Sequence, residues 1–353
     1  MTAETAGEFV ERRHGTPPYG LDRSRSSGLD GLRVFAALFV AAFHLKTVSG
    51  VGFGPLDPVV QGGDSGVYLF FALSGYLLYK PFVRGRVDLA SFGLKRAGRI
   101  VPGYFVALIG LMILTGSRLP LDHPLPFLTI SSSYDIPLRG FLGNAWTLSA
   151  EILFYLSLPL IAWAARGREI LVLVGLGLAS ATLAVAHRLT LDEGSAWLTG
   201  TYPLVFSAFV PGMLLAVLEV RHPRRFHELR GAPILASGIV LIVFGALTST
   251  LPVSLATGIG TALVMAWLLH HPMPFARALG FGGGASYALY LWHKDAFIAF
   301  GPWLGLAISL VAACLSWAAV ERPILARVHA LDAERRRAGP TAKPIPVPVQ
   351  PTP

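Results

Sequence analysis

Long apolar runs separated by short polar segments dominate the chain. Each run is close to the roughly 20 residues that an α-helix needs to cross the hydrocarbon core of a membrane. The region 231–276 has no Asp, Glu, Lys or Arg over 46 residues, about 69 Å as a helix, so it must fold back once, with Pro252 marking the turn. The pattern predicts ten membrane-spanning helices, over residues 32–51, 66–83, 100–116, 145–164, 170–187, 197–218, 232–249, 252–270, 283–300 and 303–320.

The composition agrees with a membrane protein. Of the 353 residues, 53% are hydrophobic and only 14% are charged, whereas an ordinary soluble domain has about 25% charged residues. This composition rules out a typical soluble enzyme, and the fold class that we expect is all-α, a polytopic membrane protein of about ten helices. The single cysteine, Cys314, rules out a disulfide framework, a cysteine zinc site and an iron–sulfur cluster.

The basic residues indicate which side of the membrane the loops face. The net charge is +9, and if the N-terminus lies inside the cell, the cytoplasmic segments hold 24 of the 29 Lys and Arg residues. Because positive charge concentrates on cytoplasmic loops, this bias predicts that both termini are cytoplasmic, and it explains the basic balance without a nucleic acid partner. The expected location is the cytoplasmic (inner) membrane.

The pattern divides the chain into three parts. Residues 1–28 are expected to be a polar cytoplasmic segment, residues 29–325 the transmembrane domain, and residues 326–353 a cytoplasmic tail that is first basic and then Pro-rich. The polar lead is too long for a cleavable signal peptide, so we expect the run from Leu32 to be a signal-anchor span. Six prolines in the last fourteen residues favour a disordered or polyproline-like end.

Ionisable side chains inside the predicted spans are candidate functional residues, because they are costly in lipid. Arg33 and His44 lie eleven residues apart on the first span, which places them on one face with about 16 Å of axial rise between them. One interpretation is that both line the same groove. The alternative is that Arg33 snorkels to the cytoplasmic interface and His44 is a packed polar side chain.

The fourth span carries a carboxylate. Glu151 lies one or two turns after Trp146, and Tyr155 follows four residues later on the same face. A buried carboxylate needs a partner, and a His or Arg on a neighbouring helix is the natural candidate. Such a pair fits either a catalytic role or a structural salt bridge.

Two further groups of polar residues stand out. On the ninth span, Ser286, Tyr290 and His293 form one stripe, which fits either a site or an interhelical hydrogen-bond seam. At the start of the third span, Arg96 and Arg99 lie three residues apart. Such a pair suits phosphate groups, although charge that only sets the topology explains it equally well.

Taken in chain order, these residues resemble the motifs of the acyltransferase-3 family of integral membrane O-acyltransferases. The resemblance covers residues 29–323, and its elements follow the order of the family. They are Leu29-Asp30-Gly31-Leu32-Arg33 with His44; the segment GVYLFFALSGYLL from Gly66 to Leu78; Arg96, Arg99, Pro102 and Tyr104; Trp146, Leu148, Glu151, Phe154 and Tyr155; Ser286, Tyr287, Tyr290, Leu291 and His293; and Glu321 with Pro323. Each element alone is a weak signal, but their order is specific.

The resemblance implies transfer of an acyl group, commonly acetyl, from a cytoplasmic acyl-CoA to a hydroxyl of a sugar or glycosylated compound. The family's catalytic histidine falls on His44, and its conserved glutamate falls on Glu151, which we expect to orient the imidazole. Its arginines fall on Arg33, Arg96 and Arg99, which we expect to hold the phosphates of acyl-CoA. Candidates for binding substrate or the oxyanion are Ser74, Trp146, Tyr155, Ser286, Tyr290 and His293, and no metal site is expected.

The chain departs from the family pattern at two points. It ends soon after the tenth predicted span, so we expect a stand-alone member without the fused hydrolase-like domain that some members carry. Ala97 and Gly98 separate the two arginines, where many members have further basic residues, so the phosphate contacts stay open.

Three classes of acceptor or activity also stay open. The first is acylation of a cell-envelope glycan or glycolipid, and the second is acylation of a macrolide or another secondary metabolite. The third is a transporter or flippase for a lipid-linked sugar, in which His44, Glu151 and His293 would relay protons. In all three cases the lipid bilayer surrounds the protein.

Overall fold

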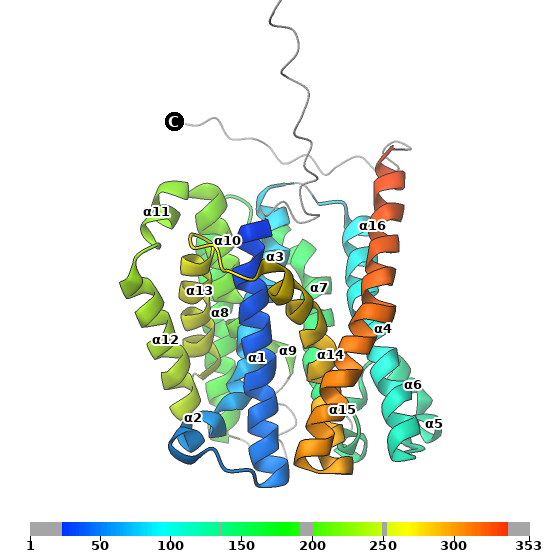
Figure 1. The fold of residues 1–353 in the computed structure, drawn as a ribbon. Coiled ribbons are helices and arrows are strands. Elements are labelled where there is room, and N and C mark those ends of the chain that lie inside the picture. The colour runs from blue at the N-terminus through cyan, green and yellow to red at the C-terminus, as the bar shows by residue number, and fades with distance from the viewer. Residues whose placement is uncertain (1–22, 86, 135, 191–200, 249–252, 338–353) are drawn as a thin grey trace, which may run out of the picture.

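The protein is a bundle of helices that run side by side (Figure 1). The computed structural model describes residues 23–85, 87–134, 136–190, 201–248 and 253–337, and every regular element within these ranges is helical. The first helix, α1 (Arg23–Ser49), begins at the end of the bundle where the last helix, α16 (Arg322–Arg337), finishes. We call this the terminal end. Because the first and the last helix meet at the same end, the chain is expected to cross the bundle an even number of times.

Each of the ten predicted spans overlaps helix within the described residues, although 197–200, 249 and 252 lie outside them. After α1, the long helices are α3 (Gly66–Val83), α4 (Leu89–Thr115), α7 (Trp146–Ala164), α8 (Glu169–Thr190), α10 (Val210–Arg221), α12 (Ala232–Leu247), α13 (Val253–Leu268), α14 (Ala276–Phe300) and α15 (Pro302–Leu315). Short helices lie between them: α2 (Asp57–Gln61), α5 (Leu119–Asp122), α6 (Pro124–Leu128), α9 (Tyr202–Val205) and α11 (Pro223–Glu228).

Six helices among the described residues are long and apolar enough to cross a membrane. A seventh crossing results if the segments on either side of a 44° bend, Tyr202–Ala208 and Val210–Arg221, count as one span. Helices α12 and α13 are apolar but shorter, and α14 carries Arg277, Lys294 and Asp295. The chain is therefore a polytopic, all-helical membrane protein, while the number of ten spans and the membrane face of the termini stay predictions.

Glycines allow α3 and α10 to touch along their backbones. A Cβ atom on Gly75 would lie 2.2 Å from the carbonyl oxygen of Phe209, and one on Gly212 would lie 1.9 Å from that of Ala72. Small residues at such contacts are typical of helix packing in membranes, where close backbone approach replaces the hydrophobic driving force. This contact fixes the position of α3, which carries Ser74.

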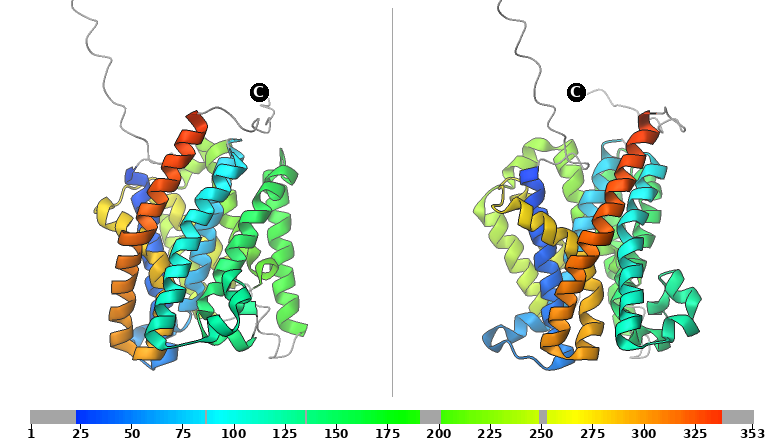
Figure 2. Two further views of the ribbon diagram at one scale, coloured as in Figure 1. Left: turned by 90° about the vertical axis from the view of Figure 1, so that its right-hand side faces the viewer. Right: turned by 45° about the vertical axis from the view of Figure 1, so that its right-hand side comes forward.

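The packed structure extends beyond the predicted end of the transmembrane domain. Helix α15 continues through a π-helical segment, η8 (Ser316–Glu321), into α16, which lies alongside α4 (Figure 2). The Nζ atom of Lys95 on α4 lies 2.6 Å from a carboxylate oxygen of Asp332, which is nearly buried. We had predicted that residues 326–337 are part of the tail, but in the structure they pack on the bundle, because this ion pair ties them to α4.

The ends of the chain fall partly outside the described residues. At the N-terminus, the helix already begins at Arg23, within the segment predicted to be polar and separate. Residues 1–22 and the Pro-rich residues 338–353 lie outside the described ranges, so the expectations for them stay predictions.

Candidate active site

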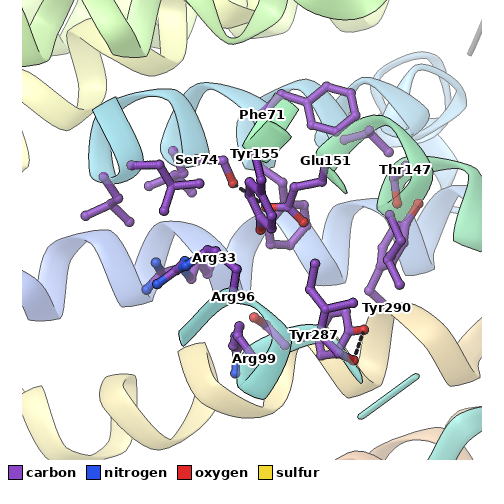
Figure 3. A pocket seen from close by; sticks show the side chains of 18 residues that line it. Arg33, Phe71, Ser74, Arg96, Arg99, Thr147, Glu151, Tyr155, Tyr287 and Tyr290 are labelled. Atoms are coloured by element: carbon purple, nitrogen blue, oxygen red, sulfur yellow. Dashed lines mark hydrogen bonds between the residues drawn. The ribbon is translucent and has the colours of Figure 1, made fainter. Parts of the chain in front are cut away.

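A cavity between α1, α3, α4, α7 and α14 brings most of the predicted site residues together (Figure 3). Of the eleven candidates, eight line it: Arg33, Ser74, Arg96, Arg99, Glu151, Tyr155, Ser286 and Tyr290. The rest of the lining is mainly apolar, with Phe70, Phe71, Leu73, Leu77, Leu78, Ile100 and Leu148 among it. His44, Trp146 and His293 do not line the cavity.

The three arginines lie on one side of the cavity, as Figure 3 shows. Arg33 pairs with Asp30 at 2.5 Å on the same helix. The guanidinium of Arg96 lies 5.9 Å from the ring centres of both Phe92 and Tyr155. Aromatic faces hold a guanidinium in place, and a cluster of three guanidiniums is a chemical arrangement that can bind anionic groups.

Arg99 occupies a cage of its own. Its guanidinium lies 5.4 Å from the ring centres of both Tyr287 and Trp317, and it is within 3.5 Å of the carboxylate of Glu321. Glycines make room for this cage: a Cβ on Gly284 would lie 2.2 Å from the indole of Trp317. The position of Arg99 is therefore determined from three directions.

Glu321 is a site residue whose role the sequence reasoning missed. Its side chain is 0% exposed, it lies at the end of the π-helical segment η8, and the hydroxyl of Ser316 donates a hydrogen bond of 2.9 Å to it. Short π-helical stretches occur often at functional sites. The signal was present in the sequence, because a carboxylate at the end of an apolar span needs a partner, which here is Arg99.

Glu151 lies in the middle of the cavity, but it does not orient His44 as we had predicted. Its carboxylate accepts a hydrogen bond of 2.7 Å from the hydroxyl of Ser74 on α3. The imidazole of His44 instead contacts another imidazole, with 3.0 Å between its Nδ1 and the Nε2 of His293. The expected arrangement fails because α14, and not α7, packs most closely on α1 in the described bundle.

The hydrogen bonds of the two imidazoles define their tautomers. The Nδ1 atom of His293 lies 3.0 Å from the carbonyl oxygen of Leu289, which can only accept, so Nδ1 carries the hydrogen. The neutral His293 ring therefore offers the lone pair of Nε2 to the Nδ1–H of His44, whose other near neighbour is the carbonyl of Val40 at 3.1 Å. This leaves Nε2 of His44 as a proton acceptor, on a ring that is half-buried, whereas His293 is 0% exposed.

The imidazole pair adjoins the cavity through Tyr290. The ring centres of Tyr290 and His293 are 5.8 Å apart, and Tyr290 lies on the side of the cavity away from the arginines (Figure 3). The hydroxyl of Tyr290 donates a 3.2 Å hydrogen bond to the carbonyl of Asn144. The three arginines, the carboxylate of Glu151 and the imidazole pair therefore lie in this order from one end of the cavity to the other and beyond it.

The remaining candidates have partners within the protein. Ser286 donates to the carbonyl of Gly283 at 2.9 Å, and Ser74 donates to Glu151. Trp146 packs edge-on against Phe71, with 6.1 Å between ring centres, so it supports the cavity wall from behind. An oxyanion would therefore compete with existing acceptors for the hydroxyl groups of Ser74, Ser286 and Tyr290.

The segment before α7 is hydrogen-bonded to α14 close to the imidazole pair. The backbone N–H of Leu142 donates to Asp295 at 3.0 Å, and the side-chain amide of Asn144 donates to the carbonyl of Tyr290 at 3.0 Å. Asp295 and Asn144 are further residues that the sequence reasoning did not assign to the site. No group of three or more His, Cys, Asp or Glu side chains suited to a metal ion occurs within the described ranges.

Comparison with known proteins gives one family and several relatives. The profile of the acyltransferase-3 family, described as an acyltransferase domain, matches residues 26–321. The chain is 32% identical to the exopolysaccharide production protein ExoZ of Rhizobium meliloti, over 80% of this chain and 95% of that protein. It is 27% identical to the acyltransferase MdmB of Streptomyces mycarofaciens, over 76% of this chain and 78% of that protein.

A third relative is longer than this chain. The peptidoglycan O-acetyltransferase OatA of Listeria monocytogenes is 25% identical over 84% of this chain, and the match spans 55% of that protein. No solved structure matches the chain.

Proposed function

The chain belongs to the acyltransferase-3 family and is an acyltransferase, and from this premise we propose that it transfers an acyl group, in the simplest case acetyl, from acyl-CoA to a hydroxyl of a glycan. The observation that carries the proposal is the order of groups along the cavity: three guanidiniums, then Glu151 with Ser74, then the imidazole pair beyond Tyr290. This order matches a long donor with phosphates at one end and a thioester at the other.

Arg33, Arg96 and Arg99 hold the phosphates of the donor in this proposal. Guanidinium groups bind phosphate through charge-assisted hydrogen bonds, and the apolar lining of the cavity suits the pantetheine arm. About 16 Å of helix rise separates Arg33 from His44, a span that the extended arm can cover. The carboxylate of Glu151, midway, offers an acceptor for the amide N–H groups of the arm.

His44 acts as the general base. Its Nε2 takes the proton from the acceptor hydroxyl as the oxygen attacks the thioester carbonyl, and the tetrahedral intermediate then expels the CoA thiolate, which receives the proton. His293 accepts the Nδ1–H of His44 and so keeps the reactive nitrogen unprotonated and fixed in direction. The half-buried ring leaves a face for the acceptor, while the donor arrives through the cavity.

The acceptor that we propose is a cell-envelope glycan or glycolipid. Two of the similar proteins are named for exopolysaccharide production and peptidoglycan O-acetylation, which supports a glycan. A secondary metabolite such as a macrolide is the alternative acceptor. We further propose that the terminal end faces the cytoplasm of the inner membrane. Arg33, Arg96 and Arg99, which meet cytoplasmic acyl-CoA in this proposal, lie in the first halves of α1 and α4, and both helices begin at this end.

Release of free CoA from acetyl-CoA tests the proposal directly. The purified full-length protein, reconstituted in vesicles, is incubated with radiolabelled acetyl-CoA and an extract of cell-envelope glycans, and both thiol release and labelled glycan are measured. We expect both to depend on His44. Absence of thiol release with glycans and with a macrolide would contradict the proposed donor.

Replacement of His293 separates an orienting role from a structural one. His293→Ala removes the acceptor of the His44 Nδ1–H, and a hydrogen bond of this kind is worth about 1 kcal/mol, so kcat should fall roughly fivefold with KM for acetyl-CoA unchanged. In His293→Gln the side-chain oxygen can accept the same hydrogen, so part of kcat should return. Equal and wild-type-like kcat values in both variants would contradict the orienting role.

A further inference from the structure

A second groove lies at the terminal end of the bundle, apart from the candidate active site. It is a space of about 590 Å³ between the last turns of α3, α7 and α10 and the first turn of α8. The connection from α3 to α4 contributes Gly85 and Val87, and the first residue of α4 contributes Leu89. None of the residues that line this groove lines the active-site cavity.

The walls of the groove are apolar, and its opening faces outward. The wall residues are Tyr79, Phe82, Val83, Val87, Leu89, Pro159, Leu160, Ala162 and Trp163. Leu160 is 65% exposed and Trp163 is 63% exposed, so these large side chains have no protein neighbours that cover them in the described bundle. In a membrane protein such side chains meet lipid.

A stripe of exposed side chains on α7 leads to the groove. Leu153, Leu156, Leu160 and Trp163 follow one another at spacings of three and four residues, so they lie on one face of the helix. The stripe starts in the middle of the bundle and ends with the indole near the helix end. Tryptophan is enriched at this depth, where hydrocarbon meets the headgroups. The groove therefore opens at the level of lipid headgroups.

The polar rim of the groove is net positive. Arg166 and Arg221 contribute two guanidinium groups, and Glu169 is the single carboxylate among the described lining residues. One guanidinium nitrogen of Arg221 lies 3.2 Å from Glu169, and about half of the Arg221 side chain stays exposed. Basic rims above apolar walls at a membrane interface match the two parts of an anionic phospholipid, its phosphate and its acyl chain.

We propose that this groove binds an anionic phospholipid of the surrounding bilayer. Its phosphate contacts Arg166 and Arg221, and an acyl chain lies against Leu160 and Trp163. A lipid bound there also bridges the ends of α7, α8 and α10 in the described bundle. The proposal is independent of the acyl transfer reaction, because it rests on other residues and another face of α7.

Quenching of Trp163 by brominated lipids tests the proposal. The full-length protein and Trp163→Phe are reconstituted in phosphatidylcholine vesicles that contain increasing fractions of either dibrominated phosphatidylglycerol or dibrominated phosphatidylcholine. The difference in fluorescence between the two proteins isolates Trp163. With about 1 kcal/mol for one uncompensated arginine at the membrane surface, we expect half-quenching at an about fivefold lower fraction of the brominated phosphatidylglycerol.

Arg166→Gln is the decisive variant, because Arg221→Gln would also break the ion pair with Glu169. In Arg166→Gln the two brominated lipids should quench Trp163 at nearly equal fractions. Arg224→Gln, an exposed arginine on α11 outside the groove, is the matched control and should keep the fivefold preference. Equal quenching by both lipids in the wild-type protein, or an unchanged preference in Arg166→Gln, would overturn the proposal.

Discussion

Replacing His44 by alanine is expected to lower the kcat of acyl transfer by a factor of about 10² to 10⁴, the usual contribution of a general base. The variant loses the only nitrogen of the imidazole pair that is left as an acceptor, because His293 uses its Nδ1–H on Leu289 and its Nε2 on His44. The acceptor hydroxyl then loses the base that this mechanism assigns to it. Binding of acetyl-CoA should persist, since the arginines lie on the side of the cavity away from Tyr290, which adjoins the imidazole pair.

The measurement is the rate of CoA release with saturating acetyl-CoA, together with the affinity for CoA by titration calorimetry. His271→Ala is the matched control: it removes an imidazole that stacks on Trp267 and contacts the carbonyl of Trp267, and that does not line the cavity. A His44→Ala protein that keeps more than half of the wild-type kcat would be incompatible with the mechanism. An equally large loss of kcat in His271→Ala would also be incompatible with the mechanism.

The fold could be predicted from the sequence where composition alone decides it. Runs of about 20 apolar residues can satisfy their backbone only as helices in lipid, so each of the ten ranges overlaps helix within the described residues. The predicted end of the last helix was wrong because an ion pair between Asp332 and Lys95 holds α16 on α4. These residues are 237 positions apart, so no local sequence pattern indicates that they pair. Hydropathy also says little about α14, whose Ser286, His293 and Asp295 are buried inside the bundle.

The members of the site could be predicted, but their pairing could not. Arg33 and His44 share a helix, so helix geometry relates them, whereas His44 and His293 are 249 positions apart and meet only because α14 packs on α1. We predicted that Glu151 pairs with the imidazole of His44, but in the structure its carboxylate accepts a hydrogen bond from Ser74. The cage of Arg99 depends on the missing Cβ of Gly284, a feature that no charge pattern reports.

Replacing Arg99 by alanine is expected to lower kcat/KM for acetyl-CoA by about 10- to 100-fold. A charge-assisted hydrogen bond to phosphate is worth about 1.5–3 kcal/mol, and each 1.4 kcal/mol is a factor of ten. The same variant should use acetyl-pantetheine, which has the thioester and the arm but none of the CoA phosphates, as well as the wild-type protein does. The ratio of the two kcat/KM values therefore isolates the phosphate contact from any effect on folding.

Glu321→Gln and Arg118→Ala complete this test. Glu321→Gln keeps the guanidinium of Arg99 but removes the buried charge that holds it, so the preference for acetyl-CoA over acetyl-pantetheine should fall about tenfold, the cost of one displaced charged hydrogen bond. Arg118, exposed at the end of the bundle opposite to the terminal end, is the control and should leave the ratio unchanged. If Arg99→Ala lowers kcat/KM equally for both donors, Arg99 supports the fold of the cavity and the CoA phosphates bind elsewhere.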